Sequence, residues 1–187
     1  MTLIILAHPT FDESLANKTI VEELQKSNLA IEIRNLHELY PDFQIASQTE
    51  QEVLLRHNTV VFQYPFYWYN MPAILKQWFD VVFEQHFAFG SKGDKLKGKN
   101  FLASFTVGGK EKDYTTLEKH HFHVYEFCKN LEQTAYFAQM NFVEPIYTYR
   151  TSLADGFTKD EIRNVAKEHS KKLINRLIEM NLYNYPQ

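Results

Sequence analysis

Short apolar runs alternate with amphipathic stretches along most of this chain, and this alternation limits the fold more than any other feature. The first apolar run covers residues 3–7, and the stretch from Pro72 to Phe83 repeats apolar residues at the helical period. Strands that alternate with helices are typical of βαβ units, which build parallel sheets. Strands are expected at residues 3–7, 31–34, 59–64, 101–106 and 142–146, and helices at 14–27, 48–57, 72–83, 122–138 and 159–180.

The character of each strand indicates its place in the sheet. Residues 31–34 alternate apolar and charged side chains, which indicates an edge, whereas strands 3–7, 59–64 and 101–106 are apolar enough to be central. Pro145 lacks a backbone donor, so the last strand should also lie at an edge. The sequence therefore predicts one α/β domain over residues 1–187. Its fold is a flavodoxin-like, doubly wound, five-stranded parallel sheet in the order 2-1-3-4-5, with helices on both faces.

Charge and cysteine content exclude several classes of protein. The net charge is −3 and the basic residues form no dense run, so no nucleic-acid partner is expected. The single cysteine, Cys128, favours a reducing compartment, and it is expected to be a small buried residue rather than a nucleophile. No stretch approaches a membrane span, and residues 3–7 are too short for a signal-peptide core. We expect a cytoplasmic protein without a metal site.

The loop after the first strand is a candidate phosphate site. Ligands of such sheets bind outside the carboxyl ends of the strands, near the switch point between strands 1 and 3. Ser14 is a natural N-cap and Asn17 lies one turn further, so the start of this helix could cradle a phosphate. Ordinary capping is the alternative. Neither the G-x-G-x-x-G fingerprint nor the Walker lysine is present in this loop.

The loops after the third and fourth strands suggest an aromatic ligand. Four consecutive aromatic residues, 66–69, lie between Pro65 and Pro72 and could form a shelf for a flat ring, with subunit-interface packing as the alternative. Gly108 and Gly109 permit a positive φ and a close backbone approach to a ligand, although a plain turn would also use them. Together the three loops suggest a cofactor with a ring system and a phosphate. Flavin mononucleotide (FMN) fits that description.

Several of these segments resemble the NAD(P)H:quinone reductase family. Residues 7–9 and 14–17 resemble its opening, and residues 62–80 resemble its long central signature. Residues 96–99, residues 106–109 and Tyr114 continue the match, and residues 132–135 are similar to a later segment. In length the chain is similar to the short bacterial members, which include ancillary subunits of potassium efflux systems.

The resemblance implies a role for each matching residue. His8 and residues 14–17 would hold the flavin phosphate region, residues 65–69 would line the ring, and residues 106, 108 and 109 would contact its pyrimidine edge. Tyr114 and His120 match the family's catalytic pair, and the chain must turn between them for the side chains to meet. The implied cofactor-binding residues are His8, Ser14, Leu15, Ala16, Asn17, Pro65, Phe66, Tyr67, Trp68, Tyr69, Thr106, Gly108 and Gly109.

The leading hypothesis is a flavoenzyme that takes hydride from NAD(P)H and passes two electrons to a quinone-like acceptor by a ping-pong mechanism. The alternative is a flavin- and nucleotide-binding regulatory subunit of a potassium/proton efflux transporter, and a third class is the electron-carrying flavodoxins. FAD could replace FMN, and the nucleotide could be NADH or NADPH. Aromatic residues make up 15% of the chain, which favours a homodimer whose partner completes the pocket.

Overall fold

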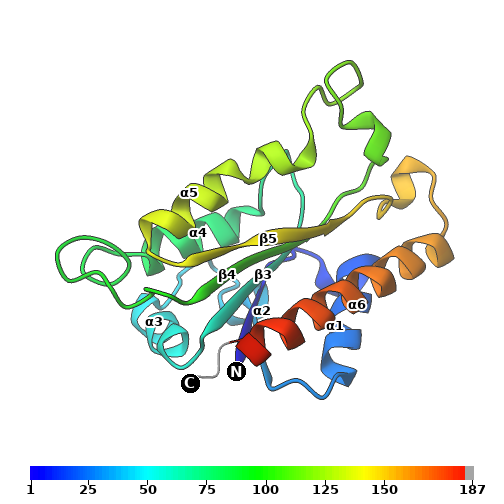
Figure 1. Ribbon diagram of the computed structural model, residues 1–187. Helices are drawn as coiled ribbons and strands as arrows, with labels where there is room; N and C mark the ends of the chain where they lie inside the picture. Colours follow the sequence, from blue (N-terminus) through cyan, green and yellow to red (C-terminus); the bar gives the residue numbers. More distant parts are fainter. Residues whose placement is uncertain (184–187) are drawn as a thin grey trace.

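The computed structural model describes residues 1–183; residues 184–187, which the predicted domain includes, lie outside that part. Five parallel strands form one sheet in the order β2-β1-β3-β4-β5 (Figure 1). They are β1 (Thr2–Leu6), β2 (Ile31–Asn35), β3 (Thr59–Pro65), β4 (Asn100–Thr106) and β5 (Asn141–Thr148). The predicted flavodoxin-like strand order is therefore confirmed.

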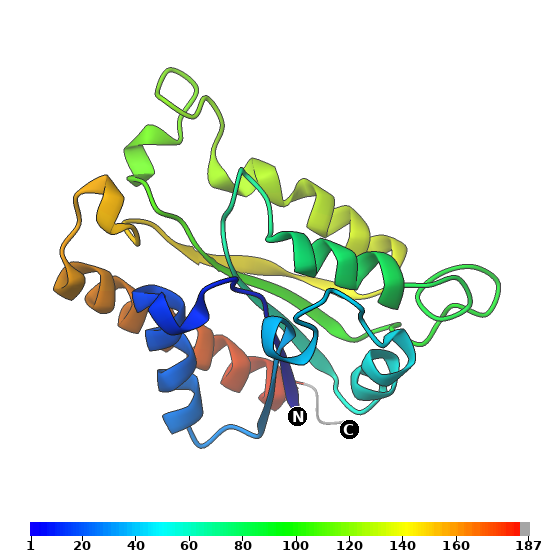
Figure 2. The same cartoon turned by 180° about the vertical axis from the view of Figure 1, so that it is seen from behind.

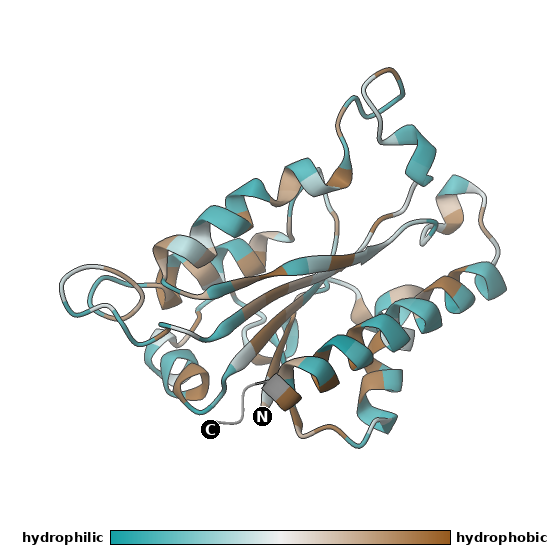
Figure 3. Ribbon diagram, viewed as in Figure 1, coloured by the Kyte–Doolittle hydropathy of each residue, from teal (hydrophilic) through white to brown (hydrophobic). Residues whose placement is uncertain are grey.

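Helices cover both faces of this sheet and give each face its own core (Figures 1 and 2). One face carries α1 (Leu15–Lys26) and α6 (Lys159–Tyr183), which pack against each other. The other carries α2 (Leu36–Leu39), α3 (Ser47–Leu55), α4 (Ala73–Val82) and α5 (Lys129–Phe137). Side chains alternate along a strand, so Ile4 faces the core beneath α1 and α6, while Leu3 and Ile5 face the core beneath the other four helices. Figure 3 shows the resulting apolar strands between helices with hydrophilic outer faces.

Helix α4 follows the predicted apolar period. It begins directly after Pro72, whose missing N–H falls where a helix has no internal acceptor for it. Trp78 is fully buried, and its ring packs edge-on against Phe62 of β3. The buried residues of α4 are Ile74, Leu75, Trp78, Phe79 and Val82. The packing of α4 on β3 therefore holds both ends of the loop that joins them, residues 66–72.

Strand β5 is irregular at its proline. Leu102 pairs with Val143 and Ser104 pairs with Ile146, so two residues of β5, Glu144 and Pro145, lie opposite one residue of β4. A bulge of this kind accommodates a residue that cannot donate to the ladder. The predicted edge position of this strand is confirmed.

Two local predictions differ from the structure. The short helix α2 follows β2 directly, and its four residues are too few to show a periodic pattern. The helix predicted over residues 122–138 is wrong at its start, because residues 124–128 form a separate 3₁₀ helix and α5 begins at Lys129. The Glu126 carboxylate accepts a hydrogen bond from the His123 backbone N–H (2.7 Å), which caps that turn on its own. None of the helices within residues 1–183 combines the length and apolar character needed to cross a membrane.

Candidate functional site

A cavity of about 420 Å³ lies at the carboxyl ends of β1, β3 and β4. The start of α1 and the segment after β5 complete its wall. The predicted site residues that line it are His8, Ser14, Leu15, Ala16, Asn17, Pro65, Phe66, Tyr67, Thr106 and Gly108. The structure thus brings together the three loops that the sequence singled out. Trp68, Tyr69, Gly109, Tyr114 and His120 lie outside this lining.

The start of α1 is capped as predicted. The Ser14 hydroxyl oxygen accepts hydrogen bonds from the Asn17 backbone N–H (3.2 Å) and from the Asn17 side-chain amide (3.3 Å). A hydroxyl that accepts in this way keeps its own hydrogen free to donate. The unpaired N–H groups of the helix start also favour a negative charge. Capping and ligand binding are therefore compatible here.

His8 lines the cavity and is almost fully buried, with 6% of its surface exposed. Its Nδ1 accepts a hydrogen bond from the Thr10 backbone N–H (3.2 Å), so the ring proton resides on Nε2. Burial, reinforced by the neighbouring His37, lowers the pKa of His8 to about 4. At neutral pH His8 is an uncharged group with one N–H to donate.

The aromatic loop is a tight turn rather than a continuous shelf. Tyr67 and Asn70 exchange backbone hydrogen bonds of 2.9 and 3.0 Å, and both residues between them have positive φ angles. Trp68 lies at the tip with 92% of its surface exposed, while Tyr69 stacks on Phe127 with centroids 5.2 Å apart. Of the four aromatic residues, only Phe66 and Tyr67 line the cavity.

Of the two glycines after β4, Gly108 serves close packing, and neither serves an unusual backbone angle. Neither has a positive φ, so that part of the sequence argument is wrong. A Cβ atom at Gly108 would lie 3.1 Å from both the Asp155 carboxylate and the Ser152 Cβ, and one at Gly109 would lie 3.5 Å from the Tyr114 ring. Gly108 therefore lets the segment after β5 approach the end of β4, whereas a Cβ at Gly109 would make only ordinary contact with Tyr114.

Tyr114 and His120 meet because the chain turns between them, as predicted. Their rings stack with centroids 4.0 Å apart and an interplanar angle of 17°. The His120 backbone N–H donates to the Asp113 carbonyl (2.9 Å), which closes the turn, and the Tyr69 hydroxyl lies 3.1 Å from His120 Nδ1. Burial, together with the nearby Tyr69, Asp155 and Asp113, raises the pKa of Tyr114 to about 12. Burial and Lys119 lower the pKa of His120, so the protonated Tyr114 phenol stacks on an imidazole that stays neutral to a lower pH than a free histidine does.

Sequence reasoning missed the segment after β5. The residues that line the cavity without having been predicted are Thr10, Glu13, Thr151, Ser152, Leu153, Asp155 and Ile162. The Val107 N–H donates to the Thr148 carbonyl (2.8 Å), which ties this segment to the end of β4. The available signal was the polar pair Thr151 and Ser152 just beyond the carboxyl end of the fifth strand. Figures 1 and 2 show this segment at the same end of the sheet as the loop after β4.

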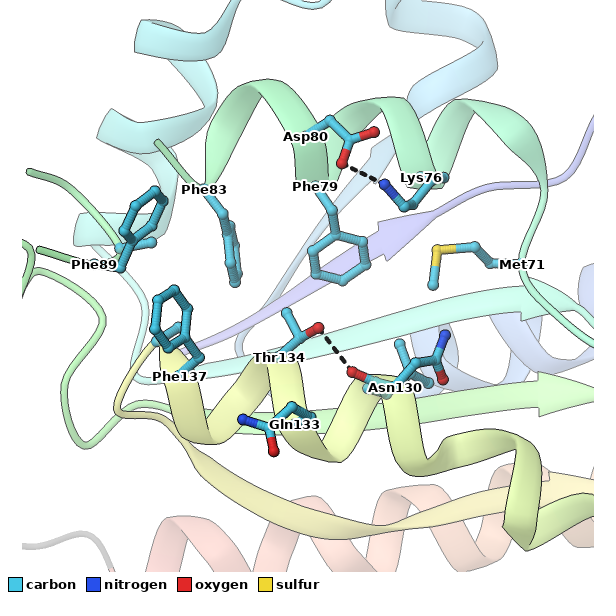
Figure 4. Close-up of a pocket in the computed structure, with 13 residues that line it drawn as sticks. Met71, Lys76, Phe79, Asp80, Phe83, Phe89, Asn130, Gln133, Thr134 and Phe137 are labelled. Carbon is cyan, nitrogen blue, oxygen red and sulfur yellow. Dashed lines mark hydrogen bonds and ion pairs between the residues drawn. The ribbon is translucent and has the colours of Figure 1, made fainter. Parts of the chain in front are cut away.

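A second hollow of about 360 Å³ lies between α4 and α5 (Figure 4). Its wall carries Phe79, Phe83, Phe89 and Phe137, and an ion pair between Lys76 and Asp80 lies at its rim. Polar or charged residues also line it (Lys76, Asp80, Asn130, Gln133 and Thr134), but none of the predicted site residues does. Residues 1–183 also contain no group of three His, Cys, Asp or Glu side chains placed to hold a metal ion. The polar cavity at the strand ends is the better candidate for the functional site.

Comparison with known proteins identifies the family of this chain. A family described as having a flavodoxin-like fold matches residues 1–173. The chain belongs to this family.

Its relatives include oxidoreductases and a transporter subunit. The uncharacterized NAD(P)H oxidoreductase YrkL of Bacillus subtilis (strain 168) is 36% identical over 89% of this chain and 93% of its own length. The glutathione-regulated potassium-efflux system ancillary protein KefF of Enterobacter sp. (strain 638) is 37% identical over 92% of this chain and 94% of its own. The solved structure of general stress protein 14 from Treponema denticola, in complex with FMN, is 29% identical, with a TM-score of 0.83 over 93% of this chain and 98% of that chain. The family resemblance predicted from the sequence is confirmed.

Proposed function

We propose that this chain is a flavin-dependent NAD(P)H oxidoreductase that binds FMN in the cavity at the strand ends. The observation that carries this proposal is a cluster of hydrogen-bond donors at the start of α1. The Ser14 hydroxyl, the His8 Nε2–H and the unpaired helix N–H groups belong to residues that line the same cavity. Relatives named NAD(P)H oxidoreductase and a similar structure in complex with FMN support it.

The residues present fit the chemical parts of FMN. A phosphate carries only acceptors at neutral pH, and the donors at the start of α1 suit it. The aromatic faces of Phe66 and Tyr67 suit a flat ring, and the backbone of Gly108 leaves space at its edge. Asp155 and Glu13 line the exposed part of the cavity, where their carboxylates can accept hydrogen bonds from the hydroxyls of a ribityl chain.

Bound FMN would supply the hydride chemistry: it would accept two electrons from NAD(P)H and, after the nucleotide leaves, pass them to a quinone-like acceptor in a ping-pong sequence. The chain's own task is to handle the charge that this transfer moves. We propose Tyr114 as a hydrogen-bond donor to developing negative charge, because its high pKa keeps the phenol protonated. His120, stacked on Tyr114 and within 3.1 Å of the Tyr69 hydroxyl, can hold or supply a proton near neutral pH.

The first experiment is purification followed by identification of bound flavin and stopped-flow reduction with NADH and with NADPH. We expect near-stoichiometric FMN and reduction of the flavin by at least one nucleotide. A Ser14→Glu variant should lose most of its FMN affinity, because it places a carboxylate where the phosphate would bind. Leu39→Glu, an exposed site on α2, is the control for the added charge. Unchanged FMN affinity in the Ser14 variant would remove the phosphate assignment.

Regulation of a potassium/proton efflux transporter is the second candidate function, favoured by the 37% identity to a potassium-efflux ancillary protein. Both functions would use the same nucleotide and flavin site. Co-purification with a cation transporter, together with a change in ion flux on flavin reduction, would favour the regulatory role. An acceptor reduced rapidly in the absence of any partner would favour the enzyme. We place either function in the cytoplasm, in keeping with the single cysteine.

We also propose a homodimer whose partner subunit completes the pocket. Support comes from exposed apolar side chains, among them Phe122, Tyr136 and Phe137, and from the hollow of Figure 4, which Phe137 lines. Apolar surface that is exposed and contiguous marks interaction sites. Sedimentation velocity at micromolar concentration should give a dimer, and a fully active monomer would refute the proposal.

A further inference from the structure

A chain of buried polar side chains crosses the sheet from α6 to the cavity. His169 Nε2 lies 2.8 Å from the Ser104 hydroxyl, which lies 2.6 Å from Gln63 Oε1. Gln63 Nε2 donates in turn to the Asn17 side-chain carbonyl at 2.9 Å. None of the four residues is more than 2% exposed. Polar groups buried this deeply are costly to place in a core unless they are hydrogen-bonded, so this network is a specific feature of the fold.

The network ends on two hydroxyls in the cavity wall. The Asn17 amide Nδ2 donates to Thr106 Oγ1 at 3.0 Å and to Ser14 Oγ at 3.3 Å. Thr106 and Ser14 both line the cavity, whereas Gln63, Ser104 and His169 do not. Each hydroxyl accepts from Asn17 and therefore has its hydrogen left to donate. The direction of the buried hydrogen bonds therefore decides whether the hydroxyls of Ser14 and Thr106 accept from Asn17 or donate to it.

The direction of the hydrogen bonds follows from the imidazole at the far end. With protons running toward the cavity, His169 donates through Nε2–H and its Nδ1 carries a lone pair. Reversing every bond would move the ring proton to Nδ1, which has no hydrogen-bond partner within residues 1–183. A buried N–H without an acceptor is rarer and more costly than a buried acceptor without a donor. The direction from His169 toward the cavity is therefore the stable one.

We propose that His169, Ser104 and Gln63 are positioning residues that hold the hydroxyl hydrogens of Ser14 and Thr106 toward the cavity. The site then offers two fixed O–H donors and selects a ligand group that only accepts, such as an ionised phosphate or a ring carbonyl. The identification of that ligand as FMN rests on the proposed function. The direction of the network does not, because it depends only on the buried residues.

The direction is tested first, on the unaltered protein without flavin. Long-range ¹H–¹⁵N spectra distinguish the two neutral tautomers of a histidine, because protonated and unprotonated ring nitrogens have separate chemical shifts. We expect His169 at pH 7 to carry its proton on Nε2. A proton on Nδ1 would reverse the network and overturn the proposal, whatever ligand the cavity binds.

The effect on the ligand is tested by replacing the middle hydroxyl. Ser104→Ala removes the bond to Gln63, so the amides are free to turn and the two hydroxyls lose their fixed direction. We expect FMN affinity, measured by quenching of flavin fluorescence, to fall roughly three- to tenfold, the effect of one net hydrogen bond. The control is Ser170→Ala on α6: Ser170 is 1% exposed, against 0% for Ser104, and its hydroxyl donates to the Ala166 carbonyl (2.7 Å). It should change FMN affinity less than twofold, although it also loses a buried hydrogen bond; Ser104→Ala loses two, to Gln63 and to His169.

A double-mutant cycle separates positioning from general loosening of the fold. In a Ser14→Ala/Thr106→Val background the two hydroxyls are gone, so adding Ser104→Ala should change FMN affinity less than twofold. An equal loss in both backgrounds, or no loss in the single variant, would contradict the positioning role. If the unaltered protein does not bind FMN at all, the proposed function fails, and the tautomer of His169 then decides the network alone.

Discussion

The turn at the tip of the aromatic loop has a backbone that its residues do not favour. Trp68 and Tyr69 have φ angles of 48° and 63°, the left-handed pair that a type I′ turn requires and that glycine or asparagine usually supplies. A residue other than glycine in this region costs about 1–2 kcal/mol. Trp68 recovers little of this cost by packing, because 92% of its surface is exposed.

Replacing Trp68 with glycine should therefore raise the stability of the flavin-free protein. Relief of about 1–2 kcal/mol is partly offset by the greater freedom of glycine in the unfolded chain, about 0.5–1 kcal/mol. The net gain is about 0–1.5 kcal/mol, and its midpoint of about 0.75 kcal/mol is equivalent to a rise in Tm of about 2–3 °C for a chain of this size. Differential scanning calorimetry of the flavin-free protein measures it directly.

The matched control is Leu117→Gly. Leu117 is as exposed as Trp68, at 95%, but its φ is not positive, so the substitution adds unfolded-state freedom without relieving strain. Its Tm should fall. If Trp68→Gly lowers Tm as much as Leu117→Gly does, the turn is not strained and the reasoning is wrong. A higher Tm combined with slower acceptor reduction would show that the strain is retained for function.

Three further predictions concern the core, pH and catalysis. Glu50 is fully buried, and its carboxylate accepts hydrogen bonds from Arg34. In urea titration, Glu50→Gln should therefore lower the free energy of unfolding by about 3–5 kcal/mol. The exposed control, Glu52→Gln, should change it by less than about 0.5 kcal/mol. Burial and the charge of Lys172 lower the pKa of His169 to about 3, so the unfolded state binds the extra proton below pH 6.5 and stability falls as pH drops from 6.5 toward 3. The slope is up to about 1.4 kcal/mol per pH unit, and His169→Asn should remove it while titration of the remaining groups continues. Tyr114→Phe should slow flavin reduction in stopped-flow experiments on the order of 100-fold while retaining FMN, and an unchanged rate from pH 6 to 9 would make Tyr114 structural.

The strand order could be read from the sequence because each strand carries its own signal. The charged alternation of residues 31–34 and the proline at position 145 identify the edges, and the apolar runs between them identify the centre. The site elements at the strand ends follow from that order, since parallel strands bring their carboxyl ends together. This is why Ser14, Asn17 and Thr106, far apart in the chain, were predicted to share one cavity.

What the sequence could not supply depends on three-dimensional neighbours. The segment from Thr151 to Asp155 reaches the cavity because the end of β5 pairs with β4 and the Val107 N–H donates to the Thr148 carbonyl. Trp68 is exposed because it lies in a turn that requires positive φ angles. Tryptophan and tyrosine disfavour such angles, so residue propensities do not predict this turn. The bond between Ser104 and His169 joins residues 65 positions apart, and neither shows a local pattern that would pair them.

The two halves of the cavity are held in different ways, and this has a consequence for specificity. The half built by Ser14 and Thr106 is fixed by buried hydrogen bonds that reach through the sheet to α6. The half built by the aromatic loop rests on an exposed, strained turn with few contacts at its tip. A rigid network suits a cofactor that stays bound, while a loosely supported turn can adapt to acceptors of different shape. Substitutions at Ser104 should therefore change FMN affinity and leave the preference among acceptors intact. Substitutions at Trp68 should change that preference at constant FMN affinity, so comparing the two variants over a series of quinones tests whether binding and acceptor choice are separate.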